Sequence, residues 1–218
     1  MNKFTVKGLL FSLVFGLSSM AQANLIVNGD FEDVDVANGA WNHFAAADVG
    51  WSGDRVEIWD SLGGIEAHSG EQHAELNAHG NNSGNWEIYQ TFYTDEGMGY
   101  DFGFAYMARQ NDSEAFLFEI LGENGVDVLF SMEMNDHVKN VWSTLDYDFV
   151  ADGDMATIRF SSITPESATV GNFLDAVYVE GNGGGNQTSV PEPSTLLIFS
   201  LALLGLNWRR VSASLQRK

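Results

Sequence analysis

The chain has 218 residues, with 30 acidic and 10 basic side chains, a formal net charge of −20 and no cysteine. This balance argues against nucleic-acid binding through a basic surface, since phosphate recognition needs clustered Lys and Arg. The absence of cysteine excludes disulfides, thiolate metal sites and a cysteine nucleophile. With 44% hydrophobic and 12% aromatic residues, the chain is expected to fold around a sizeable core.

The charge is distributed unevenly along the chain. Residues 24–190 carry 4 basic and 29 acidic side chains, a balance of −25, whereas residues 1–23 carry +2 and residues 191–218 carry +3. The two ends therefore differ in kind from the middle.

Residues 1–23 predict a secretory signal peptide. Lys3 and Lys7 precede an apolar run at 8–17, and an Ala-Gln-Ala cleavage site ends at Ala23. The alternative is an uncleaved membrane anchor, for which the apolar run is too short. We therefore expect signal peptidase to cut after Ala23 and the mature chain to leave the cytoplasm.

Residues 24–180 have the pattern of short strands. No apolar period of helical length appears, whereas apolar and polar residues alternate in runs such as 100–106 and 116–120. One apolar face per strand is typical of antiparallel sheets packed on a core. The predicted strands are 25–28, 54–59, 72–77, 86–94, 100–109, 114–121, 126–131, 141–150, 156–162 and 172–180. About ten strands at this spacing predict an all-β domain, an antiparallel β-sandwich or jelly roll.

Strand parity predicts a ligand-binding face. Val56 and Ile58 take the core side of their strand, so the residues between and after them face away. The same reasoning on neighbouring strands assigns six side chains to one outward set: Glu57, Trp59, His73, Glu75, Asn77 and Arg109. An aromatic ring stacks on the apolar face of a sugar, while carboxylates, amides and Arg bind its hydroxyls. The alternative is an ordinary solvated polar face.

Other chemistry has less support in the sequence. Glu57 and Glu75 could form a glycosidase pair, which needs carboxylates about 5–10 Å apart, but no hydrolase motif surrounds them. We therefore predict that the protein is not an enzyme. The spacing of His68, His73 and His79 fits no zinc pattern. The remaining tryptophans are expected to be core or loop anchors: Trp41, Trp51, Trp86 and Trp142.

The mature N-terminus carries a resemblance to a fold family. The run from Asn24 to Glu32, Asn-Leu-Ile-Val-Asn-Gly-Asp-Phe-Glu, resembles the opening strand of galactose-binding-like jelly rolls, which include carbohydrate-binding modules. Gly50-Trp51, the run 69–77 and the closing segment 173–177 are similar to further parts of that pattern. The resemblance implies a sandwich with a binding task and does not define which task.

This resemblance also implies a structural Ca²⁺ that ties the first strand to the last. Glu32 and Asp175 are the positions that match the family's metal ligands. Ca²⁺ takes six to eight oxygens, so backbone carbonyls near Asp30 and the turn at Ser69–Gly70 would complete the shell. The alternative is that both are solvated carboxylates. A domain without disulfides outside the cell has a physical use for such a metal.

The C-terminal region divides into a linker and an apolar segment. The Gly-rich residues 181–189 predict a flexible linker. Val190, Pro191, Glu192 and Pro193 follow, and residues 194–208 are uncharged and predict a transmembrane helix. Its length of about 22 Å is short of the roughly 30 Å hydrocarbon core, a difference that local thinning of the bilayer can absorb. Arg209 and Arg210 place that end in the cytoplasm.

The order of these parts resembles the PEP-CTERM sorting signal of Gram-negative bacteria. The resemblance covers residues 190–218 and includes an eight-residue tail after Arg210 that is longer than usual. It implies recognition by an exosortase, transient anchoring in the inner membrane, and delivery to the cell surface or the extracellular polysaccharide matrix. A plain membrane anchor is the alternative.

Together these features predict an exported protein whose domain, residues 24–180, binds carbohydrate or extracellular polysaccharide without catalysis. The alternative is a calcium-stabilised structural protein of a matrix or biofilm without a sugar pocket. The charge of the middle region makes cations and neutral or cationic polymers its natural partners and excludes nucleic acid.

Overall fold

The computed structural model describes residues 23–53, 55–79, 86–165 and 169–182. Three predicted parts lie outside the described residues: the signal peptide before Ala23, most of the linker 181–189, and the whole segment 190–218, which includes the helix predicted at 194–208. In the part of the chain that is described, no helix has the length and apolar character to span a membrane.

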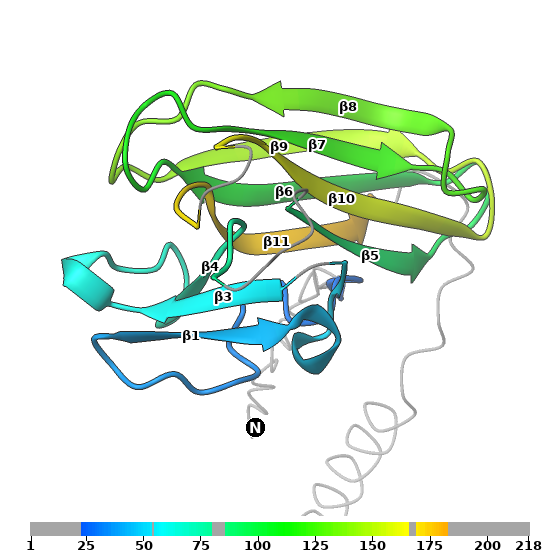
Figure 1. Cartoon of the computed structure of the whole chain (residues 1–218). Helices are drawn as coiled ribbons and strands as arrows, with labels where there is room; N and C mark the ends of the chain where they lie inside the picture. The colour runs from blue at the N-terminus through cyan, green and yellow to red at the C-terminus, as the bar shows by residue number, and fades with distance from the viewer. Residues whose placement is uncertain (1–22, 54, 80–85, 166–168, 183–218) are drawn as a thin grey trace, which may run out of the picture.

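The described residues form a sandwich of two antiparallel sheets (Figure 1). Sheet A has the order β1-β3-β4-β11-β6-β9, and sheet B has the order β2-β5-β10-β7-β8. The strands are β1 (Ala40–Ala45), β2 (Ser52–Gly53), β3 (Arg55–Asp60), β4 (Gln72–Glu75), β5 (Glu87–Tyr93), β6 (Gly99–Met107), β7 (Ala115–Leu121), β8 (Val128–Met134), β9 (Ser143–Val150), β10 (Met155–Thr164) and β11 (Phe173–Gly181). The prediction of an all-β antiparallel sandwich is confirmed.

The core between the sheets is a stack of phenylalanine rings. Alternation along β6, β7 and β10 points one side chain in two into the gap between the sheets. Phe104 of β6 meets Phe118 of β7 with ring centroids 4.8 Å apart, and Phe160 of β10 lies 5.1 Å from both. All three residues are buried to 2% exposure or less. Tilted and edge-on contacts of this kind add to the stabilisation from burial alone.

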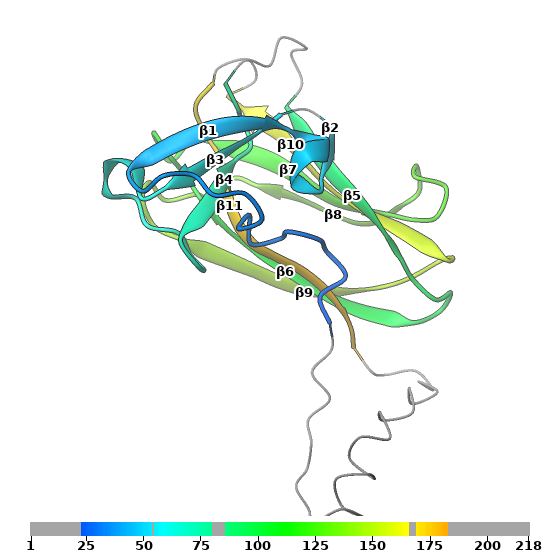
Figure 2. The ribbon, with the colours of Figure 1, turned by 90° about the horizontal axis from the view of Figure 1, so that it is seen from below.

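The opening segment is not the strand that the sequence predicted at 25–28. It lies alongside β11 (Figure 2), where Leu25 N–H donates to the Val179 carbonyl at 2.8 Å and Val177 N–H donates to the Gly29 carbonyl at 2.8 Å. A positive φ of 50° at Asn28 prevents a continuous extended strand. The segment therefore closes the edge of β11 beyond the residues that pair with β4.

Two short strands were missed by the sequence reasoning. β1 and β2 carry no clear apolar alternation, because β1 is half-exposed at the edge of sheet A and β2 is two exposed residues long. β8 begins later than predicted, at Val128, because Asn124–Gly125 and the residues around them form the hairpin turn. β11 continues to Gly181, the first residue of the predicted linker.

Replacing Phe118 should destabilise the sandwich, because its ring contacts four other phenylalanines across both sheets. Phe118→Ala is expected to lower the free energy of unfolding by about 3–5 kcal/mol. Urea denaturation followed by near-UV circular dichroism measures this loss. Val126→Ala, at a position 75% exposed, is the control and should stay within about 0.5 kcal/mol of wild type; equal stabilities of the two variants would contradict this account of the core.

Candidate functional site

The predicted ligand-face residues do come together on sheet A. The register pairs Glu57 with Glu75 and Trp59 with His73 across β3 and β4. The Arg109 guanidinium lies 4.4 Å above the centre of the Trp59 ring, and its Nη1 donates to both Glu75 oxygens at 2.8 Å. The Trp59 indole donates to Glu57 Oε1 at 2.8 Å. Parity reasoning therefore found a real cluster on the outer side of this sheet.

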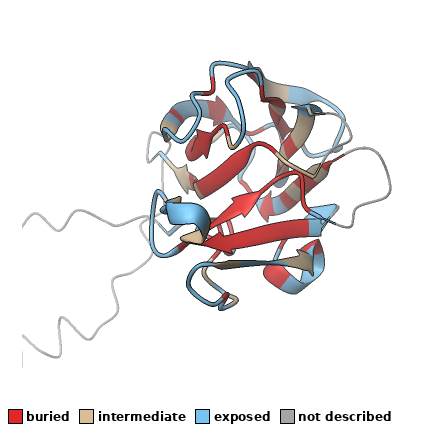
Figure 3. Ribbon diagram, turned by 60° about the vertical axis from the view of Figure 1, so that its left-hand side comes forward, coloured by how far each residue is buried: buried red, intermediate tan, exposed pale blue. Residues whose placement is uncertain are grey.

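The prediction that this cluster is a solvent-exposed face is wrong. Figure 3 shows the strands that carry it as buried, and the exposed fractions are 3% for Glu57, 4% for Trp59 and 0% for His73, Glu75 and Asn77. Only Arg109 is partly open, with 26% of its side chain exposed. The reason is that Leu62, Ile65 and Trp142 pack over Trp59 and its neighbours as a second, smaller apolar cluster. Alternation defines the side on which a residue leaves a sheet and does not define what covers that side.

Hydrogen bonds within the protein occupy the polar atoms of this cluster. Besides Arg109, Glu75 accepts from Gly171 N–H at 2.7 Å, and Glu57 accepts from His79 N–H at 2.8 Å. Asn77 donates to the Pro165 carbonyl at 3.1 Å. These contacts tie loops to the sheet, which is a structural role. With both carboxylates buried and bonded in this way, the geometry does not support a glycosidase pair at Glu57 and Glu75.

Burial shifts the titration of two members of the cluster. Burial raises the pKa of Glu75 well above its usual value, and the Arg109 charge opposes that rise. Burial lowers the pKa of His73 to about 4, and its two ring nitrogens have no hydrogen-bond partner among the described residues. The His73 ring instead packs edge-on against Phe173 and Trp142. The His73 ring therefore lies inside the covered cluster, out of contact with solvent.

Glu32 and Asp175 converge on one turn, as the predicted calcium site requires. Asp175 Oδ2 accepts from Ser69 N–H at 2.8 Å, while Glu32 Oε1 accepts from Glu71 N–H at 2.7 Å and from Gln72 N–H at 2.8 Å. The opening segment, the closing strand β11 and the 69–72 turn therefore meet at these two carboxylates. Asp175 is fully buried, and burial, with a smaller contribution from Glu32, raises its pKa to about 7.

The combined negative charge of Glu32 and Asp175 matches the charge of a divalent cation. The ion pairs of the described residues join Arg109 to Glu75 and Arg159 to Glu119, so neither neutralises Glu32 or Asp175. A bound cation would remove the repulsion between the two carboxylates and the cost of burying the Asp175 charge. Within the described ranges, no group of three or more His, Cys, Asp or Glu could hold a metal, so most ligands would have to be backbone carbonyls or water.

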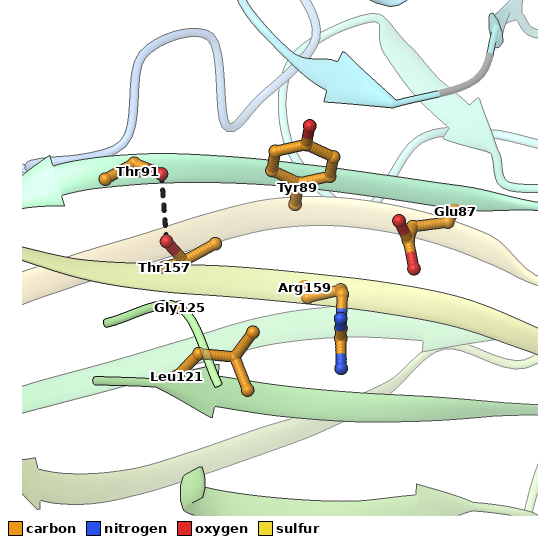
Figure 4. Close-up of a pocket in the computed structure, with 7 residues that line it drawn as sticks. All are labelled: Glu87, Tyr89, Thr91, Leu121, Gly125, Thr157 and Arg159. Atoms are coloured by element: carbon orange, nitrogen blue, oxygen red, sulfur yellow. Dashed lines mark hydrogen bonds between the residues drawn. The ribbon is translucent and has the colours of Figure 1, made fainter. Parts of the chain in front are cut away.

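A pocket that the sequence reasoning did not find lies on the outer face of sheet B (Figure 4). Its volume is about 370 Å³, and it spans β5, β10 and β7. The lining residues are Glu87, Tyr89, Thr91, Leu121, Gly125, Thr157 and Arg159. These side chains alternate with core residues such as Ile88 and Ile158, so they leave the sheet on the side away from the sandwich core.

Two residues that line the sheet B pocket, Tyr89 and Arg159, belong to a row of three side chains from three strands. The register pairs Tyr89 with Arg159 and Arg159 with Glu119. Arg159 Nη2 and Nε donate to Glu119 Oε2 at 2.6 Å and 3.0 Å, and 31% of the Arg159 side chain stays exposed. On one side of this row the Thr91 and Thr157 hydroxyls are 2.8 Å apart.

Sequence reasoning missed this pocket for a definite reason. Tyr89, Glu119 and Arg159 are each ordinary outward residues of their strands, and their meeting depends on β5 and β7 both pairing with β10. The signal that could have found it is Tyr89-x-Thr91 in β5 together with Thr157-x-Arg159 in β10, two outward polar pairs that match in register. Only the strand order makes them neighbours.

Comparisons with known proteins identify the sorting signal and find solved structures that the sandwich resembles. Residues 189–211 match the model of the PEP-CTERM protein-sorting motif. Among curated proteins, none matches the chain. The sandwich resembles solved carbohydrate-binding modules, with low identity.

One is TmCBM61 in complex with β-1,4-galactotriose, at 15% identity over 73% of this chain and 99% of that chain, with a TM-score of 0.47. A CBM4 structure shares 18% identity over 72% and 99% of the two chains, with a TM-score of 0.42. A family 16 carbohydrate-binding module shares 14% identity over 72% and 99%, with a TM-score of 0.46. At these identities and TM-scores the likeness carries no argument about a site, and the assignment of a site depends on this chain's own residues.

Asp175 should make the metal-free protein less stable as pH rises. Its pKa is about 7 in the folded state against an ordinary value of 3.8 for an aspartate, so between these values the folded state holds a proton that the unfolded state has released. Stability then falls with rising pH, by up to about 4 kcal/mol between pH 4 and 8.

Thermal unfolding across that pH range in excess EDTA tests the sign. Asp175→Asn should flatten the slope, while the exposed-site control Asp148→Asn should keep it. A wild-type slope unchanged by Asp175→Asn would contradict the assignment.

Proposed function

We propose that the domain binds carbohydrate, without catalysis, through the sheet B pocket. One observation carries this proposal: Tyr89, Arg159 and the Thr91 and Thr157 hydroxyls line one open pocket of sugar size, and the buried Glu119 holds Arg159 in an ion pair. A sugar offers an apolar ring face and a rim of hydroxyls, so it needs an aromatic surface beside donors and acceptors of fixed direction.

The pocket supplies both kinds of contact in a preformed arrangement. The half-exposed Arg159 can donate from its free N–H groups while its ion pair with Glu119 fixes the plane of the guanidinium. Because all three strands are paired through the sheet, these groups lose little conformational entropy when a ligand binds.

The sorting signal gives this binding a location. The PEP-CTERM motif implies an exported protein that an exosortase processes and that reaches the cell surface. We place the domain in the extracellular polysaccharide matrix of a Gram-negative bacterium. It would arrive there after signal peptidase cleavage at Ala23 and transient anchoring in the inner membrane through residues 194–208. The charge of −25 over residues 24–190 favours neutral or cationic polymers over acidic ones.

A second candidate function rests on the pair formed by the buried Asp175 and the half-buried Glu32. Glu32 and Asp175 join the opening segment, β11 and the 69–72 turn, and no basic side chain is ion-paired to either among the described residues. We propose that Ca²⁺ binds there and locks the two ends of the domain together. In the alternative reading the protein is a calcium-stabilised structural component of the matrix, and the sheet B pocket has no ligand.

Removing the Tyr89 ring should abolish glycan retention. Tyr89→Ala is expected to weaken binding at least about tenfold, because stacking on an aromatic ring contributes on the order of 1.4 kcal/mol or more. Affinity electrophoresis in gels containing galactan, xylan or β-glucan measures retention. Tyr147→Ala, which removes a half-exposed tyrosine of β9, is the matched control and should migrate as wild type. If both variants are retained equally on every polymer that retains the wild type, the assignment of the pocket as the binding site is contradicted.

Calcium removal should lower the melting temperature. At about 100 times Kd, Ca²⁺ binding would add roughly 2.7 kcal/mol, which corresponds to about 5–10 °C for a domain of this size. Differential scanning calorimetry with CaCl2 and then with excess EDTA measures the shift. Asp175→Asn and Glu32→Gln should each remove the calcium response. A melt that is the same in CaCl2 and EDTA contradicts the metal site.

A further inference from the structure

A second aromatic surface lies at the edge of sheet A, far in the fold from the sheet B pocket. β1 is the outermost strand of that sheet (Figure 1), and Trp41 and His43 alternate along it toward the outer face. His79 joins them from the segment after β4. The three ring centroids form a triangle with sides of 5.7 Å, 6.1 Å and 6.1 Å. We call Trp41, His43 and His79 the edge platform.

Trp41 is not part of the core. It is 39% exposed, whereas Trp51, Trp59 and Trp86 are at most 4% exposed. Within the described residues, its ring contacts are the two imidazoles of the platform. Because 39% of the residue stays exposed, part of the indole keeps its contact with water and stabilises the fold less than a fully buried ring would. The exposed part of the ring is open to a ligand.

One member of the platform is tied to the sheet by a buried carboxylate. Glu57 Oε2 accepts the backbone N–H of His79 at 2.8 Å, and the other oxygen, Oε1, accepts from the Trp59 indole. Glu57 thus holds the backbone of His79 against β3, and β3 pairs with β1, the strand that carries Trp41 and His43. A backbone held in this way loses little entropy on binding a ligand.

The platform also has an unused polar atom. His43 Nδ1 is buried and has no hydrogen-bond partner among the described residues. Buried polar atoms in folded proteins nearly always have a partner in the protein, in water or in a ligand. The Trp41 ring beside it supplies an apolar surface, and the exposed His79 supplies a second imidazole that can donate or accept.

We propose that the edge platform is a second carbohydrate site, in which a pyranose ring stacks on Trp41 and the imidazoles of His43 and His79 bind its hydroxyls. The proposal takes its ligand class from the proposed function and is otherwise independent of the sheet B pocket. The platform lies on the outer face of sheet A, and the pocket lies on the outer face of sheet B. One domain can then hold two polymer chains on opposite sides and crosslink them.

Counting sites tests this directly. The full-length chain, in a detergent without sugar headgroups, is titrated calorimetrically with β-1,4-linked hexasaccharides of galactose, xylose and glucose. The variants are Trp41→Ala, His79→Ala, Tyr89→Ala, the Trp41→Ala/Tyr89→Ala pair and the control Tyr147→Ala. Circular dichroism melts establish that each variant is folded.

We expect the wild type and Tyr147→Ala to bind two oligosaccharides per chain, Trp41→Ala and Tyr89→Ala to bind one each, and the double variant to bind none. His79→Ala should weaken one site about tenfold, which keeps the test valid if Trp41→Ala fails to fold. Addition of the matching polymer should raise turbidity for the wild type and for neither single variant.

Four results would contradict the edge platform, the sheet B pocket or both as carbohydrate sites. A single wild-type site that Tyr89→Ala abolishes and Trp41→Ala leaves unchanged overturns the edge platform alone. A single site with the opposite response overturns the sheet B pocket alone. No heat with any oligosaccharide overturns both. A response to Cu²⁺ that His79→Ala removes, without any glycan binding to the Tyr89→Ala variant, replaces the sugar assignment of the platform with a metal.

Discussion

The packing of phenylalanine rings between two sheets is the interaction on which the rest of this structure depends. Phe104, Phe118 and Phe160 come from three strands in two sheets, and their contacts set the distance and alignment of those sheets. Once the inner face of each strand is committed to this core, every alternate residue is directed outward. The candidate sites are therefore made of outward residues, and their positions follow from the way in which the core aligns the strands.

The outer faces of the two sheets differ in how far other segments cover them. On sheet A, Trp142 and loop residues cover the middle of the face, so that the Arg109–Glu75 pair and Trp59 are enclosed as a second core. That face stays open at its two margins, at Trp41 and along β9, where Asp146 and Asp148 are exposed. On sheet B the face is uncovered along β5, β10 and β7, and the pocket lies there. A buried ion pair stabilises little in net terms, but it fixes the geometry around it. The Arg109–Glu75 pair supports the loops above sheet A, whereas in the ion pair of sheet B the Arg159 side chain stays 31% exposed.

The sequence predicted some of this and missed some of it for physical reasons. Nine of the observed strands overlap predicted ones, because alternation is local and visible. The pairing of Glu57, Trp59, Glu75 and Arg109 was also foreseen, since parity assigns them to one side. Their burial was not, because the side chains that cover them come from distant loops. Tyr89 and Arg159 were missed since neither is unusual in its own strand.

The sequence by itself determined the properties that depend on composition or on short segments. These are the sorting motif at 189–211, the all-β pattern, the absence of cysteine and the charge of −25 over residues 24–190. Tertiary structure alone decided which outward faces meet water and which residues become neighbours across strands. The physical reason is that period-two alternation fixes the direction of a side chain from its immediate neighbours, whereas its cover and its partners depend on contacts between segments far apart in the chain.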